Sequence, residues 1–156
     1  MKTNEIHHGD CLELMHQIPD GSVDMILADL PYGTTACRWD SIIPLGPLWA
    51  HYKRVIKPRG VIVLTACQPF TTILINAGGL DWFKYTWIWD KVGGANFLNL
   101  NNRPLKTHED ILVFSQSADF TFNPVKTMRT ESSLKRDPVG ESRIIRQGRD
   151  RSEKLT

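Results

Sequence analysis

Apolar and polar residues alternate along this chain in blocks that predict strands and helices in turn. Short apolar runs rich in β-branched residues, such as SVDMILA (22–28) and GVIVLTA (60–66), are typical of buried strands. The pattern predicts strands at 4–8, 22–28, 60–66, 83–91 and 109–116, and helices at 11–18, 44–58 and 69–79. This alternation predicts an open, mostly parallel α/β sheet, in which ligands bind beyond the carboxyl ends of the strands.

The strand before residue 29 runs directly into ADLPYGTTACRWD (28–40), whose first residues suit recognition of an amino group. Leu30 precedes a proline and is held extended, so the Asp29 carboxylate and the Leu30 carbonyl can present two acceptors close together. Tyr32 adds a flat ring, and Gly33 lets the chain turn away. Two acceptors beside an aromatic face match an exocyclic –NH2 on a planar base. The alternative is an ordinary strand-end turn, with Asp29 as a cap and Tyr32 packed.

Charge is unevenly distributed along the chain. Its 156 residues are 41% hydrophobic and 23% charged, which fits one globular domain. Residues 126–156 carry nine Lys/Arg and five Asp/Glu, whereas residues 1–125 carry ten and twelve. We expect residues 1–125 to form the folded region and 126–156 to be a basic tail. That tail is either solvated and disordered or an arm that contacts nucleic-acid phosphates.

Several other classes of protein are disfavoured. The sequence has no apolar run of membrane-spanning length and no signal-peptide core, so we expect a cytoplasmic protein. Its three cysteines form no CxxC pair, which argues against a disulfide framework or a zinc knuckle. His7 and His8 are adjacent and lack ligand spacing, so we expect no metal.

Separated stretches of the chain resemble the amino-group DNA methyltransferases. GDCLEL comes before DLPY (29–32), which stands where that family usually has D-P-P-Y. RVIKPRGVIVL, WIWDKVGGANFLN, HEDILVFS and FNPVKT follow in the expected order. The likeness is greatest to phage-type, adenine-specific enzymes of the permuted order, in which the catalytic motif precedes the cofactor motif. It implies a Rossmann-like S-adenosylmethionine-dependent methyltransferase fold, with a mostly parallel sheet and an antiparallel strand toward the C-terminus.

The resemblance also implies a role for each part of the loop. In the family, the acid of the motif and the main-chain carbonyl of its second residue bind the target amino group, and the aromatic ring stacks on the flipped base. These roles fall on Asp29, Leu30 and Tyr32, with Pro31 between them. Leucine replaces the usual first proline, which we expect to loosen the loop more than to abolish the chemistry.

The implied reaction is methyl transfer from S-adenosylmethionine to the amino group of adenine in double-stranded DNA, without a covalent enzyme intermediate. It would take place in a bacterial or phage-infected cell, as part of restriction-modification or related DNA methylation. Asp10 resembles the acid that binds the cofactor's adenine, with the Cys11 amide beside it, although an N-cap role is equally plausible. The candidates for DNA contact are Lys91, Asn96, Arg103 and Lys106 in the loop between the last two strands, and Lys126 and Arg129 in the tail.

The family's cofactor glycine motif, F-x-G-x-G after a strand, is absent from the sequence. We therefore expect an N-terminal portion of a methyltransferase, with 22–28 paired to 60–66 on one side only and 4–8 detached. Such a chain would need a complementing C-terminal segment or would self-associate.

Other functions stay open. One is the same chemistry on the cytosine amino group, although an acid at the start of the motif favours adenine. Another is a non-catalytic nucleic-acid-binding remnant. A carbon-5 cytosine enzyme with Cys67 as nucleophile is disfavoured, because it leaves Asp29 without a role.

Overall fold

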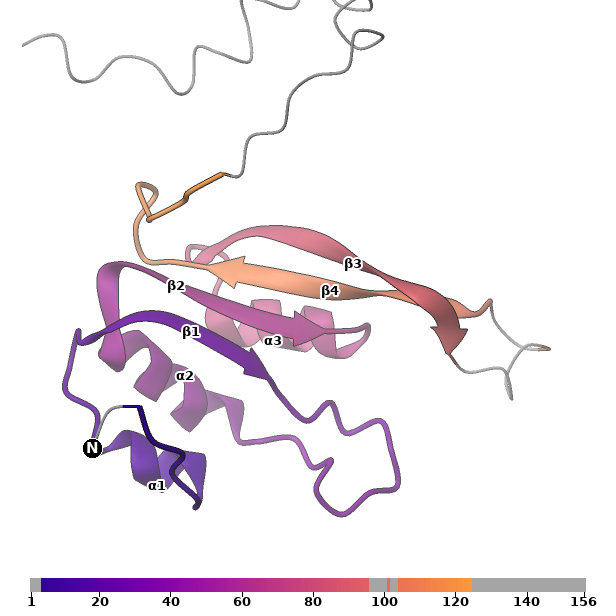
Figure 1. Ribbon diagram of the computed structural model, residues 1–156, viewed down its shortest axis with the longest axis horizontal. Helices are drawn as coiled ribbons and strands as arrows, with labels where there is room; N and C mark the ends of the chain where they lie inside the picture. The colour runs from indigo at the N-terminus through magenta and orange to yellow at the C-terminus, as the bar shows by residue number, and fades with distance from the viewer. Residues whose placement is uncertain (1–3, 96–100, 102–103, 125–156) are drawn as a thin grey trace, which may run out of the picture. The chain divides into compact units, whose positions relative to one another are not determined.

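The computed structural model describes residues 4–95, 101 and 104–124. The chain divides into two compact units, residues 1–121 and 122–156, and every described helix and strand belongs to the first. These elements are α1 (Cys11–Met15), β1 (Val23–Asp29), α2 (Leu45–Val55), β2 (Ile56–Ala66), α3 (Phe70–Gly78), β3 (Phe83–Ala95) and β4 (Lys106–Phe114) (Figure 1). In the part of the chain that is described, none of the helices has the length and apolar character to span a bilayer.

The strands form one mixed sheet in the order β1-β2-β4-β3. β1 pairs parallel with β2, while β4 pairs antiparallel with both β2 and β3. β1, β2 and β3 therefore run in one direction, and β4 is the reversed strand toward the C-terminus. The α/β fold class is confirmed. Among the described strands only one hydrogen-bonded pair is parallel, however, because β4 is inserted between two strands of the opposite direction.

β1 lies at the edge of the sheet, as predicted. It pairs with β2 on one side, and no described strand pairs with its other side. The strand predicted at residues 4–8 is wrong, because these residues form no strand in the structure. Ile6, the one strongly apolar residue of that segment, is fully exposed. Burial of its side chain therefore does not stabilise pairing of the segment with the sheet.

Several element boundaries differ from the predicted ones. α1 stops at Met15, and α2 ends at Val55, so β2 starts directly at Ile56 rather than at residue 60. Val23 pairs with Ile56 and Met25 with Val61, which leaves residues 57–60 bulged opposite a single residue of β1. The bulge accommodates Pro58, which has no N–H to donate to a ladder.

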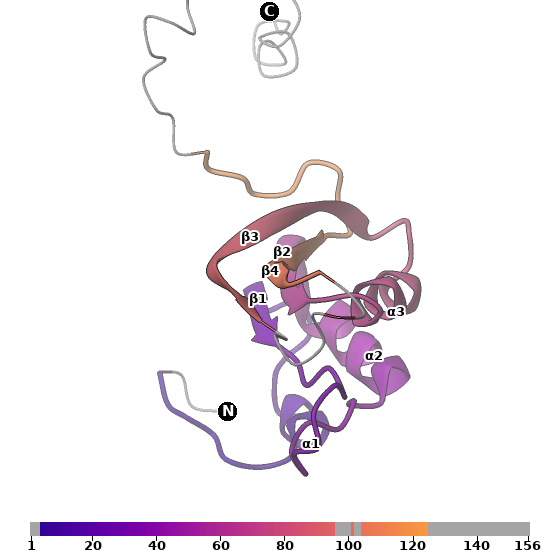
Figure 2. The same cartoon turned by 90° about the vertical axis from the view of Figure 1, so that its right-hand side faces the viewer.

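The helices cover one face of the sheet (Figure 2), with α2 against β2 and α3 against β4. Alternate strand residues point toward these helices and form the core, together with the apolar stripe of α2. The largest fully buried apolar side chains, including two from α3, are Leu48, Val55, Ile62, Leu64, Phe70, Leu74, Leu112 and Phe114. The opposite face carries large side chains that are about half exposed or more, namely Met25, Leu27, Trp87 and Trp89. By strand alternation, Asp29 and Thr65 point to this second face.

Candidate active site

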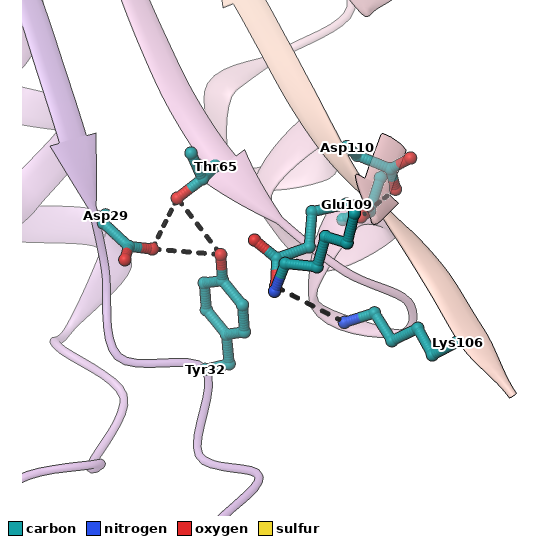
Figure 3. A network of polar contacts seen from close by, with 8 residues as sticks. Asp29, Tyr32, Thr65, Lys106, Glu109 and Asp110 are labelled. Atoms are coloured by element: carbon teal, nitrogen blue, oxygen red, sulfur yellow. Dashed lines mark hydrogen bonds and ion pairs between the residues drawn. The ribbon is translucent and has the colours of Figure 1, made fainter. Parts of the chain in front are cut away.

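Asp29 is the last residue of β1, and its carboxylate is held by the neighbouring strand. The parallel register pairs Asp29 with Thr65 of β2, so the two side chains stand next to each other on the same face. The Thr65 hydroxyl donates a hydrogen bond to Oδ1 of Asp29 (Figure 3). The carboxylate is thereby attached to a strand that is paired on both of its sides.

Tyr32 completes a triangle with these two residues. Its hydroxyl lies 3.0 Å from Oδ1 of Asp29 and 3.1 Å from Oγ1 of Thr65 (Figure 3). Of the two oxygens of the Asp29 carboxylate, only Oδ1 accepts a hydrogen bond from the described residues. The second carboxylate oxygen is therefore the one available to an incoming donor.

The ring of Tyr32 is half-buried and packs on Phe70 at the start of α3. The ring centroids are 5.4 Å apart, and the planes are tilted by 33°. Burial and then the neighbouring Asp29 carboxylate raise the pKa of Tyr32 well above its usual range, so the hydroxyl keeps its proton. In this state Tyr32 is a packed hydrogen-bond donor. The sequence had suggested either a flat face for a base or a packed ring, and the hydrogen bonds of its hydroxyl were not predicted.

Leu30 anchors the loop in the core. Its side chain is 7% exposed and belongs to the buried cluster beneath the sheet. This burial anchors the second position of the motif through its side chain, while the expectation that leucine loosens the loop relative to proline stays a prediction. Gly33 then turns the chain with φ of +66°, a conformation that L side chains rarely adopt.

Asp40 closes the loop behind Tyr32. Its buried carboxylate accepts backbone N–H bonds from Gly33, Thr34 and Thr35 at 2.9, 2.9 and 2.7 Å. The Thr35 side chain and these backbone donors lower the pKa of Asp40 to about 2, while desolvation opposes the shift. Asp40 thus stays ionised and fixes the loop that follows the motif.

An open cavity of about 280 Å³ lies beyond the carboxyl ends of β1 and β2, where ligands bind in open α/β sheets. This volume is close to the lower limit of small-molecule pockets, about 300 Å³. Its lining residues are Asp29, Leu30, Pro31, Tyr32, Thr34, Thr35, Trp39, Asp40, Trp89, Lys91 and Glu109. All four residues of the DLPY motif therefore face one space, together with two tryptophans from elsewhere in the chain.

The far side of the cavity carries an ion pair. Lys91 of β3 bonds to Glu109 of β4, and its ammonium lies 5.5 Å from the Trp89 ring centroid. Lys106 approaches Glu109 at 4.0 Å. Lys91 and Lys106 thus lie in strands rather than in the connecting loop, which corrects their predicted position, because β3 extends to Ala95 and β4 begins at Lys106.

The predicted cofactor residues are not among those that line the cavity. Asp10 is the N-cap of α1, and its Oδ1 accepts a bond from the Leu12 N–H at 2.8 Å. Cys11 is the exposed first residue of that helix. Asn96, Arg103, Lys126 and Arg129 lie outside the described residues.

The described residues bear on two alternatives, Cys67 as a nucleophile and a bound metal ion. Cys67 is buried at 9% exposure beyond the end of β2 and does not line the cavity, which fits a small packing residue. No three His, Cys, Asp or Glu side chains in this part of the chain are grouped so that they could hold a metal ion.

Seven residues of the site were not found from the sequence: Thr34, Thr35, Trp39, Asp40, Thr65, Trp89 and Glu109. Thr65 had one available signal, because it is the polar residue near the end of an otherwise apolar strand. Asp40 had none, since its partners are backbone groups.

Comparison with known proteins gives relatives of one kind. No protein-family model matches the chain. The curated protein "Type II methyltransferase M1.MboII" of Moraxella bovis is 26% identical over 135 residues, which are 79% of this chain and 50% of that protein. The chain therefore spans about half the length of this relative.

Solved structures give the same fold. The structure of M1.HpyAVI matches with a TM-score of 0.58 and 20% identity, over 80% of this chain and 61% of that one. Its SAM complex matches with a TM-score of 0.55 over 76% and 57%, also at 20% identity. A putative DNA modification methylase from Thermus thermophilus matches with a TM-score of 0.53 and 18% identity, over 81% and 56%. The resemblance to the DNA methyltransferases is therefore confirmed, and the chain has their fold over a little more than half of their length.

Proposed function

We propose that this chain is the base-binding part of an S-adenosylmethionine-dependent DNA methyltransferase that modifies the amino group of adenine. The cavity carries this proposal, because it brings the Asp29 carboxylate together with the rings of Tyr32, Trp39 and Trp89. A base taken out of the duplex offers a planar face and an amino donor, and it is bound by stacking and by acceptors. The fold and the names of the methyltransferases to which the chain is similar support the same class.

Asp29 has the central role in the proposed reaction. Its free carboxylate oxygen and the main-chain carbonyl of Leu30 each accept one hydrogen of the amino group, which makes the nitrogen lone pair less conjugated and more nucleophilic. Bound S-adenosylmethionine supplies an electrophilic methyl group. Asp29 stabilises the positive charge that develops on the amino nitrogen and accepts the proton that this nitrogen loses.

The aromatic residues bind the base in this scheme. Trp39 is 73% exposed and Trp89 is 49% exposed, so both have ring surface that a base can cover. Stacking of a base on an aromatic ring contributes about 1–3 kcal/mol, which offsets part of the cost of taking the base out of the duplex. Tyr32 contributes the face of its ring that does not pack on Phe70.

Asp10 and Cys11 are proposed to bind the cofactor. Only one oxygen of Asp10 caps α1, so the other suits the adenine amino group, with the backbone of Cys11 beside it. Contacts to double-stranded DNA are proposed for five basic residues, namely Lys91, Lys106, Arg103, Lys126 and Arg129. In this scheme residues 1–125 form the catalytic region, and residues 126–156 add a basic segment that contacts DNA. Titration of the wild type and of Asp10→Ala with S-adenosylmethionine tests the cofactor-binding role of Asp10.

The test of the function is product analysis. Because the cofactor glycine motif is absent from this sequence, the chain is combined with a C-terminal segment that supplies that motif. The mixture is incubated with unmethylated DNA and S-adenosylmethionine, the DNA is digested, and the nucleosides are identified by mass spectrometry. We expect N6-methyldeoxyadenosine. N4-methyldeoxycytidine would assign the site to cytosine, and DNA binding without either product would leave a non-catalytic binding protein.

Asp29→Ala is the matched variant for this assay. It should abolish methyl transfer and leave DNA binding nearly unchanged, because the lost contact acts mainly in the transition state. Asp24→Ala is the control, since Asp24 lies on the same strand and pairs with Lys57 at 2.7 Å outside the cavity. An Asp29→Ala variant that loses DNA binding as fully as methyl transfer would contradict the assigned role.

A further inference from the structure

The Asp29 carboxylate is set at the end of an edge strand, where nothing in its own backbone fixes its orientation. The residue is exposed, and the chain leaves the sheet immediately after it. A carboxylate that rotates freely would seldom present one oxygen to a substrate in a constant direction. An orienting partner is therefore needed for any role that depends on geometry.

We propose that Thr65 is the positioning residue of this site, acting through its hydroxyl on Asp29 and Tyr32. This inference rests on the proposed function for its catalytic consequence, although the contact itself is independent of it. Thr65 lies in β2, between β1 and β4, and pairs with Asp29 on one side and Ile111 on the other. Its side chain is β-branched and has few accessible rotamers, so its hydroxyl is the least mobile of the three groups.

The protons of the triangle support this assignment. Three oxygen–oxygen contacts join Asp29, Tyr32 and Thr65, but the two hydroxyls have only two protons between them. The ionised carboxylate can only accept, so the proton between Thr65 and Asp29 comes from the Thr65 hydroxyl. Thr65 therefore donates to Asp29, and Tyr32 donates either to Asp29 or to Thr65.

Both arrangements leave the same groups engaged. Oδ1 of Asp29 accepts the hydrogen bond from Thr65 of β2, and Oδ2 is left for the substrate's amino group. The Tyr32 hydroxyl is held in the same network, which sets the position of its ring at the wall of the cavity. Thr65, which lies in a strand paired on both sides, thus fixes the orientation of the Asp29 carboxylate and of the Tyr32 hydroxyl.

Three variants separate this role from a purely structural one. Thr65→Val removes the hydroxyl and keeps the shape, and Thr65→Ser keeps the hydroxyl. Thr72→Val is the control, because Thr72 is an exposed residue of α3 that does not line the cavity, and its hydroxyl donates to Oε1 of Gln68 at 2.9 Å. The assay is the initial rate of methyl transfer to unmethylated DNA at several DNA concentrations.

We expect Thr65→Val to lower kcat by about 10- to 100-fold, the effect of losing one hydrogen bond to a charged group, with KM for DNA changed by less than about twofold. Thr65→Ser should recover most of the rate, and Thr72→Val should behave as the wild type. A Thr65→Val variant with wild-type kcat, or a Thr65→Ser variant as slow as Thr65→Val, would overturn the proposal.

A second measurement does not depend on activity. The urea midpoints of the wild type, Thr65→Val, Asp29→Ala and the double variant form a cycle. We expect Thr65→Val to shift the midpoint less in the Asp29→Ala background than in the wild type, because its partner is already gone. Equal shifts would refute the contact. A wild type that methylates no DNA in the presence of the complementing segment would instead refute the proposed function, and the cycle would still decide whether Thr65 holds Asp29.

Discussion

Gly78→Ala should destabilise the fold on which the site is built. Gly78 is the last residue of α3, where a Cβ would lie 2.6 and 2.8 Å from two ring atoms of Trp49 and 2.9 Å from one of Phe114. Carbon atoms pack best at about 3.5–4.0 Å, so α3 must move away from α2 and β4. Both rings are rigid and buried, at 3% and 0% exposure, and cannot turn aside.

The expected magnitude is a balance of two effects. Alanine favours a helix over glycine by about 1 kcal/mol. Overpacking of a filled core costs typically about 1–3 kcal/mol and occasionally more, and three contacts this short belong at the upper end of that range. We expect a net loss of about 1–2 kcal/mol in the free energy of unfolding, which lowers the urea midpoint by roughly 0.5–1 M.

Urea unfolding followed by tryptophan fluorescence and circular dichroism measures this effect. Gly46→Ala is the matched control, since Gly46 lies exposed in the first turn of α2 and an added Cβ there meets nothing within 4 Å. It should be neutral or stabilise the protein by about 0.4–1 kcal/mol. A Gly78→Ala variant as stable as the wild type would refute the packing of α3 against Trp49 and Phe114.

Three further predictions concern other parts of the chain. The folded-state pKa of Asp40 lies below its ordinary value of 3.8, so its stabilisation is present above that pH and is lost as pH falls toward about 2. Asp40→Asn should show a smaller loss of urea stability over this window, and an equal loss would contradict the role of Asp40. Deleting residues 126–156 should weaken DNA binding and flatten its dependence on salt by about 0.9 log units per lost contact, whereas an unchanged slope would mean that the tail makes no phosphate contact. Leu27 is 68% exposed on the edge strand β1, so Leu27→Lys should raise the monomer fraction in light scattering, and an unchanged fraction would exclude self-association through this face.

The sequence by itself determined the elements and the position of the motif. Strand and helix periodicities are local, so β1, α2, β2 and α3 could be predicted to within a few residues. DLPY could be placed at a strand end for the same reason. The strand predicted at 4–8 does not form, whereas the expectation that this segment is detached from the sheet agrees with the structure. Its pattern was short, and Ile6 gains no burial that would favour pairing with the open edge of β1.

The tertiary structure alone decided how the site is assembled. Thr65 meets Asp29 because the parallel register of two strands pairs residues that are 36 positions apart in the sequence. The insertion of β4 between β2 and β3 brings Glu109 and Lys91 to the cavity. Asp40 binds backbone N–H groups whose direction depends on the folded loop. Register, strand order and loop conformation follow from the packing of distant segments, and hydrophobic periodicity along the chain does not encode them.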